Sequence, residues 1–109
     1  MIIDFHSHIC PDKIAAKVAA KMKADEIYSC GPFTLQGLLA HMGRCGIDKI
    51  VTFCVAERAQ VVRPSNDFII SITDNKIIGL GTIRPDFEDP TGEIKRLKGK
   101  GIKGIKFNS

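Results

Sequence analysis

The feature that most constrains this chain is the regular alternation of short apolar stretches with amphipathic ones. Helical patterns lie between the apolar stretches, and the connections are short. Alternation of this kind predicts a parallel sheet with right-handed crossovers. The elements follow one another along the chain as βαβαβαβ. Such a chain forms either an open doubly wound sheet or part of a (β/α)8 barrel. The predicted strands cover residues 2–8, 49–55, 77–83 and 102–107.

Capping residues and apolar spacing define the helices between these strands. In the first helix, Ile14, Val18 and Met22 recur every four residues and are expected to face the sheet. Thr34 is the expected cap of the second helix, and Gly46 is its expected stop. The predicted helices cover residues 12–22, 35–45, 64–73 and 90–100.

Composition places the chain among globular proteins. Its 109 residues are 44% hydrophobic and 26% charged, which suits a single domain over residues 1–109. No apolar run reaches the length of a membrane span and no signal peptide is visible, so we expect a cytoplasmic protein without a membrane partner. The net charge of +4 gathers in residues 95–106 without interleaved aromatic residues, so no nucleic-acid partner is expected.

Polar residues on the strands favour the barrel over the open sheet. Because side chains alternate along a strand, Asp4, His6 and His8 are expected to share one face. On the last strand, Lys106 and Asn108 share a face in the same way. The inner face of a barrel carries functional side chains near the carboxyl ends of its strands, which explains both patterns. With four parallel strands in the sequential order 1-2-3-4, the expected fold is half of a (β/α)8 TIM barrel.

His6 and His8 are the candidate metal ligands. Two imidazoles at alternate positions of one strand can converge on one ion, and neutral imidazole suits zinc, with manganese or iron as alternatives. Two ligands do not complete a site, so others must come from elsewhere in the fold. Cys10 lies two residues beyond His8, but packing at a strand-to-helix turn is the preferred interpretation. The four cysteines lack metal-binding spacing and are expected to be reduced.

Three stretches give the chain a family likeness. Residues 4–12, 79–86 and 101–107, which include Asp-Phe-His-Ser-His and a later Pro-Asp, resemble the amidohydrolase-related branch of the amidohydrolase superfamily. These enzymes are TIM barrels of about 250 residues and eight strands, so the likeness covers half of their fold. The resemblance implies a metal-dependent enzyme that hydrolyses C–N or C–O bonds of small molecules, or decarboxylates small carboxylic acids.

The resemblance also implies a set of metal ligands. His6 and His8 take the place of the family's first-strand ligands. In several branches a carboxylated lysine of the fourth strand bridges two metals, and Lys106 is the residue here that could match it. The family's other ligands, a histidine of strand five and an aspartate of strand eight, have no counterpart among the four predicted strands.

Three further residues are assigned roles beside the metal. Arg84 and Asn108 stand at strand ends where relatives often carry histidine, and they are candidate substrate-binding residues. Arg84 could clamp a substrate carboxylate with its forked guanidinium, or it could be an ordinary exposed arginine before a proline. Asp4 is expected to orient a neighbouring group rather than to bind the metal.

Two functions stay open. The first is the N-terminal half of a metal-dependent hydrolase or decarboxylase, inactive alone. The second is a non-catalytic α/β half-barrel that serves as an oligomerisation or interaction module. Because a half-barrel leaves two sheet edges and an inner face uncovered, a homo-oligomer or a missing C-terminal half is expected to cover them. A phosphate-binding domain is disfavoured, since no Gly-rich loop follows the first strand.

Overall fold

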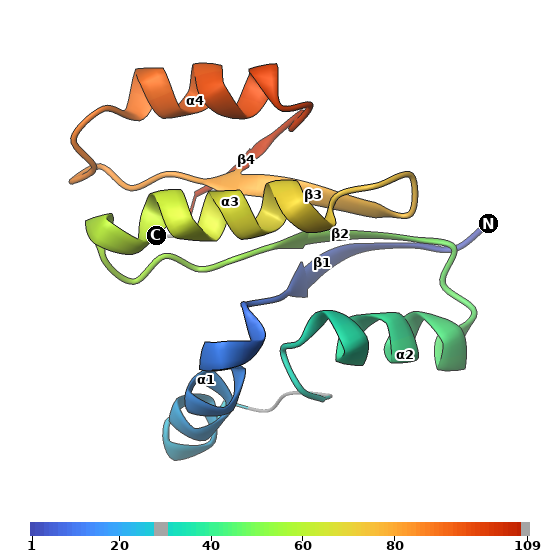
Figure 1. Ribbon diagram of the computed structural model, residues 1–109. Coiled ribbons are helices and arrows are strands. Elements are labelled where there is room, and N and C mark those ends of the chain that lie inside the picture. Colours follow the sequence, from blue (N-terminus) through green and yellow to red (C-terminus); the bar gives the residue numbers. More distant parts are fainter. Residues whose placement is uncertain (28–30, 108–109) are drawn as a thin grey trace.

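The computed structural model describes residues 1–27 and 31–107, in which strands and helices alternate (Figure 1). The strands of these residues form one parallel sheet in the order β1-β2-β3-β4. The predicted α/β class and the predicted strand order are therefore confirmed. The strands are β1 (Ile3–His8), β2 (Lys49–Phe53), β3 (Ile77–Thr82) and β4 (Ile105–Lys106).

Side-chain and glycine caps set the helix ends. Thr34 accepts a hydrogen bond from the Gly37 N–H at the start of α2, and Asp89 accepts one from Gly92 at the start of α4. Gly46 follows α2 with a φ of 63°, a left-handed conformation that suits glycine. None of the helices in the described residues is long and apolar enough to cross a membrane. The helical elements are α1 (Asp12–Ala24), α2 (Leu35–Cys45), the short 3-10 helix η1 (Ala59–Val61), α3 (Val62–Ile72) and α4 (Pro90–Gly99).

The last strand is shorter than the predicted range 102–107. At the end of α4, Ile102 donates its N–H to the carbonyl of Leu97, directly after Gly101 with a φ of 86°. This arrangement is the Schellman motif that closes many helices. Because the Ile102 N–H is used in the helix cap, it cannot pair with β3, and the strand begins only at Ile105.

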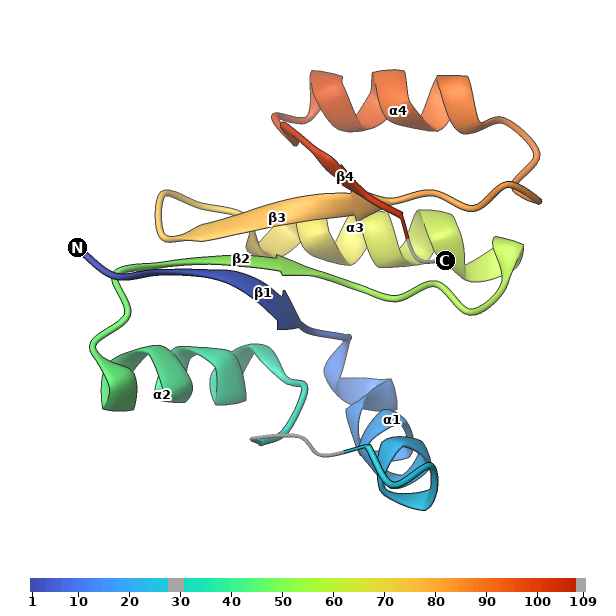
Figure 2. The same cartoon turned by 180° about the vertical axis from the view of Figure 1, so that it is seen from behind.

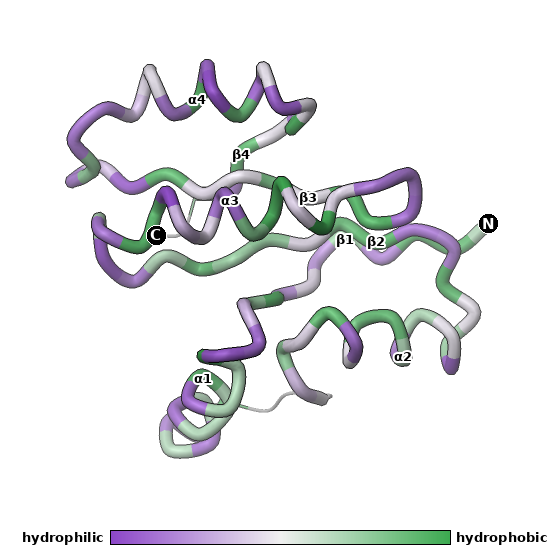
Figure 3. The backbone as a smooth tube through the Cα atoms, in the orientation of Figure 1, coloured by the Kyte–Doolittle hydropathy of each residue, from purple (hydrophilic) through white to green (hydrophobic). Residues whose placement is uncertain are grey.

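The hydrophobic core lies between the sheet and the helices. α3 lies in front of β2 and β3 in Figure 1 and behind them in Figure 2, so it covers one face of the sheet. Hydrophobic residues run along β2, whereas α1 and α4 alternate between polar and apolar residues (Figure 3). Gly79 lets α3 approach β3, because a Cβ there would lie 2.5 Å from Ile69 Cγ2. The buried residues of this core are Ile9, Leu38, Met42, Ile50, Cys54, Ile69, Ile77, Leu97 and Ile102.

α1 does not pack on the sheet, contrary to the prediction. Ile14 is 40% exposed, and the buried residue of this helix is its neighbour Ala15. Figures 1 and 2 both show α1 turned away from the strands. Lys21 Nζ forms an exposed ion pair with Glu57 Oε1, 2.7 Å away, in the segment after β2. The apolar spacing thus located the helix correctly but not the surface that it contacts.

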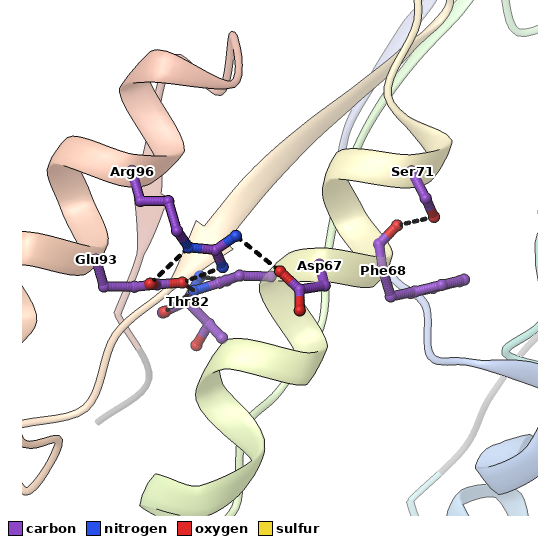
Figure 4. Close-up of polar contacts among 7 residues, drawn as sticks. Asp67, Phe68, Ser71, Thr82, Glu93 and Arg96 are labelled. Carbon is purple, nitrogen blue, oxygen red and sulfur yellow. Dashed lines mark hydrogen bonds and ion pairs between the residues drawn. The ribbon is translucent and has the colours of Figure 1, made fainter.

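A buried amide joins α3, β3 and α4. Asn66 Oδ1 accepts a 2.8 Å hydrogen bond from the Thr82 N–H, and Asn66 Nδ2 donates to the Thr82 carbonyl and to Glu93 Oε1, each at 3.0 Å. Figure 4 shows Arg96 extending from α4 to Glu93 and to Asp67 of α3, with 2.7 Å between Arg96 Nη1 and Asp67 Oδ1. Arg96, from the basic stretch of the sequence, is therefore held against a buried carboxylate.

This network keeps Glu93 ionised. Burial of the carboxyl group opposes its charge, but the hydrogen bonds from Arg96 and Asn66 hold the pKa of Glu93 below its usual value. A carboxyl group with a lowered pKa stabilises the fold above the pH at which it ionises in the unfolded chain. That stabilisation is lost as the pH falls through the pKa of the folded state.

We expect Asn66→Ala to lower the free energy of unfolding by about 2–4 kcal/mol, because it leaves the buried backbone groups of Thr82 without their partners. Asp67→Ala is the matched control on the same helix. This variant removes only the exposed ion pair between Asp67 and Arg96, and it should lower the free energy of unfolding by less than about 1 kcal/mol. Urea denaturation followed by circular dichroism measures both losses. Equal losses would show that the buried amide is not the joint between these elements.

Candidate functional site

The histidines reach the open face of the sheet through an irregularity in β1. Asp4 lies opposite Ile50 and His8 lies opposite Phe53, so three residues of β1 stand against two of β2 between these pairs. This is a β-bulge. Ile50 belongs to the core under the helices, so Asp4 lies on the helix side and His8 on the open side. The expectation that Asp4 shares the face of His6 and His8 is therefore wrong.

Asp4 holds the bulge in place. Its Oδ1 accepts a 3.0 Å hydrogen bond from the His6 N–H, two residues along the same strand. A backbone N–H bonded to a nearby side chain is withdrawn from the ladder, as in an Asx turn. Phe5, expected to lie against a helix, is instead 73% exposed within the bulge. Asp4 therefore orients the backbone of His6, and its hydrogen bond is not to the imidazole ring of His6 or His8.

The two imidazoles converge on the open face. His6 Nε2 lies 3.2 Å from His8 Nε2. Both rings pack edge-on against the ring of Phe53, with centroid distances of 5.2 Å for His6 and 4.6 Å for His8. Phe53 is buried under them. Sequence reasoning missed this phenylalanine as part of the site, although its place at the end of the second strand was a usable signal.

Lys106 joins the histidines on the open face. Its Nζ lies 5.4 Å from the centroid of the Phe53 ring, a cation–π distance. Ile105 packs on the core side, on the opposite face from Lys106, whereas Asn108, expected to share the face of Lys106, lies outside the described residues. Burial, the nearby His6 and the charge of Lys106 all lower the pKa of His8. The fold thus brings three sequence-predicted residues around one aromatic ring and favours a neutral imidazole at His8.

The histidine pair has the spacing of a metal site. Two imidazole nitrogens that bind one tetrahedral zinc at about 2.0–2.1 Å lie about 3.3 Å apart, close to the distance between His6 and His8. Without an ion, the same distance suits a hydrogen bond between neutral imidazoles. Within residues 1–27 and 31–107, no cluster of three His, Cys, Asp or Glu residues is arranged to hold a metal. Lys106 could add a third ligand only after losing its proton or becoming carboxylated.

Arg84 has its guanidinium engaged within the chain. Its Nε and Nη2 donate to the two carboxylate oxygens of Asp86, and its Nη1 donates to the carbonyl of Ala56. Arg84 was expected to hold a substrate carboxylate with two hydrogen bonds, but it holds the carboxylate of Asp86 in this way. Arg84 also lines a hollow of about 350 Å³ at the carboxyl ends of β2 and β3. The other lining residues are Val55, Ala56, Glu57, Thr82, Ile83 and Pro85.

The sequence also singled out Asn108 and Cys10. Asn108, the second candidate for substrate binding, lies outside the described residues. Cys10 is buried, and its Sγ lies 3.7 Å from the carbonyl oxygen of Phe33. Burial raises the pKa of the Cys10 thiol, which fits a packing role.

Comparison with known proteins identifies no relative. No family model, no curated protein and no solved structure matches the chain. The candidate site therefore depends on its own geometry, which is a pair of imidazoles over Phe53 beside Lys106.

We expect His8 to titrate below the usual range of histidine, because its burial and its neighbours disfavour the imidazolium ion. Lys106→Met removes one of the nearby charges and should raise the pKa of His8, with a smaller effect than burial has. Proton–carbon NMR spectra recorded across the pH range measure this directly. Lys103→Met is the matched control, since it removes an exposed lysine from the same segment. An equal rise in both variants would contradict the contact.

Proposed function

We propose that this chain supplies half of a metal-dependent hydrolase of the amidohydrolase superfamily and is inactive alone, with His6 and His8 as ligands of a divalent ion, zinc first. Its substrate is a small molecule with a hydrolysable C–N or C–O bond, or a small carboxylic acid that is decarboxylated. The observation that carries the proposal is the 3.2 Å separation of the two Nε2 atoms at the carboxyl end of β1. Parallel α/β folds place their chemistry at this end of the strands.

In this proposal the four strands are half of a (β/α)8 barrel. The sequential parallel order and the helices on one face of the sheet support this assignment. A second support is that His8 of β1 and Lys106 of β4 both lie over Phe53 of β2. Residues from the two outer strands therefore turn toward a common interior, as they do in a barrel.

The described residues have different roles in such a site. His6 and His8 hold the ion as neutral ligands, and the lowered pKa of His8 favours that state. The ion, when bound, lowers the pKa of water and polarises a carbonyl or carboxylate of the substrate. Phe53 forms the apolar floor of the site. The Arg84 hollow can receive a substrate carboxylate after Arg84 exchanges its contact with Asp86.

Zinc should bind weakly, in the micromolar range or above, because two imidazoles leave most of the coordination to water. His6→Ala and His8→Ala should each abolish measurable binding in isothermal titration calorimetry. His41→Ala is the matched control, because this third histidine lies on α2 and contacts Asp4 on the helix side of the sheet. Submicromolar binding that survives both His6→Ala and His8→Ala would place the metal elsewhere and end the proposal.

A non-catalytic module is the second candidate, and the two-imidazole site favours it. A catalytic zinc has three protein ligands, and the described part of the chain places only His6 and His8 in such an arrangement. We therefore expect the 109-residue chain alone to show no turnover with zinc or manganese. Assays against simple esters, amides and aromatic carboxylates test this. Turnover that disappears in His6→Ala would show that the chain alone is an enzyme.

A further inference from the structure

A second group of reactive side chains lies on the helix side of the sheet, away from the histidine pair. Cys45 Sγ, at the exposed end of α2, lies 3.7 Å from His41 Nδ1, one helical turn earlier. The other ring nitrogen, His41 Nε2, lies 3.8 Å from Asp4 Oδ2 on β1. A thiol, an imidazole and a carboxylate therefore stand in sequence, with the imidazole between the other two.

We propose that Cys45 is a nucleophilic thiol, activated by His41 and oriented through Asp4, that exchanges with low-molecular-weight disulfides. The order thiol, imidazole, carboxylate is the order in which an activated nucleophile, its base and the group that orients the base are arranged. The Asp4 carboxylate favours the tautomer with the proton on Nε2, which leaves Nδ1 free to accept the thiol proton. This inference requires no bound metal, although Asp4 also accepts the His6 N–H beside the candidate metal ligands.

The exchange step balances without any further reagent. His41 Nδ1 takes the proton of Cys45, and Sγ attacks one sulfur of the disulfide. The S–S bond of the reagent breaks, and a new S–S bond joins Cys45 to half of it. The departing thiolate takes the proton from His41. Cys45 is oxidised, and one half of the reagent is reduced to a free thiol.

The local charges decide whether this activation is effective. Both residues lie in the last turns of α2, where the helix dipole places a partial negative charge. Arg44 in the last turn adds a positive charge beside the sulfur in the sequence. The imidazolium formed by proton transfer also faces the Asp4 carboxylate at 3.8 Å.

The other described cysteines serve as internal controls. Cys10 and Cys54 are buried in the fold. Burial raises the pKa of Cys54 to about 12, and it also raises that of Cys10. Neither thiol combines exposure with an adjacent imidazole. Cys30 lies outside the described residues, so the experiment must identify the modified cysteine directly.

The test is the rate at which the folded chain reacts with excess dithiodipyridine or glutathione disulfide at about pH 7. We expect one fast phase, assigned to Cys45 by mass spectrometry of the modified peptide. His41→Gln should slow that phase by about tenfold or more at neutral pH, and the difference should shrink at alkaline pH, where the thiol ionises unaided. Asp4→Asn keeps an oxygen to accept the His6 N–H and should slow the phase several-fold.

Control variants make the outcome decisive. Cys45→Ser should remove the fast phase, and Gln36→Ala, an exposed change on the same helix, should leave the rate unchanged. Circular dichroism confirms that each variant is folded. The proposal is overturned if the fast phase belongs to Cys30, if it survives in Cys45→Ser, or if folded His41→Gln reacts at the rate of the unaltered chain at every pH.

Discussion

One hydrogen bond, from the His6 N–H to Asp4 Oδ1, determines on which face of the sheet the candidate metal ligands lie. This bond lies at the β-bulge, where one extra residue in β1 shifts the register between β1 and β2. In a regular strand, the pairing of Asp4 with Ile50 would send the side chains of His6 and His8 into the core under the helices. The bulge turns them to the open face, where their rings meet Phe53. The convergence of the two imidazoles thus depends on a defect in the strand.

A side chain also replaces backbone pairing at the carboxyl end of β3. β2 ends at Phe53, which lies opposite Leu80, so Thr82 extends beyond the last residue of β2. Asn66 supplies the missing partners, since its amide accepts from the Thr82 N–H and donates to the Thr82 carbonyl. α3 thereby fixes the strand end that lines the Arg84 hollow. The end of β3 is thus held in place although the ladder with β2 has ended.

Features that depend on residues close together in the sequence could be predicted from it. Features that depend on contacts between residues far apart in the sequence could not. The strand order and the Thr34 cap could be predicted from spacing and residue type. The β-bulge could not be predicted, because the alternation of side chains between the two faces assumes a strand with no extra residue. The late start of β4 depends on the use of the Ile102 N–H by α4. The convergence of His6, His8 and Lys106 over Phe53 depends on how three strands align.

α1 turns away from the sheet, and its ion pair with the segment after β2 is exposed to solvent. Its ion pair with the segment after β2 joins Lys21 to Glu57, and both side chains are mostly exposed, at 60% and 64%. Each partner shifts the pKa of the other toward the charged state, through a hydrogen bond and direct attraction. Dissolved ions screen attractions between exposed charges. Added salt should therefore weaken this contact between α1 and the segment after β2, whereas the apolar packing under α3 and α4 does not depend on it.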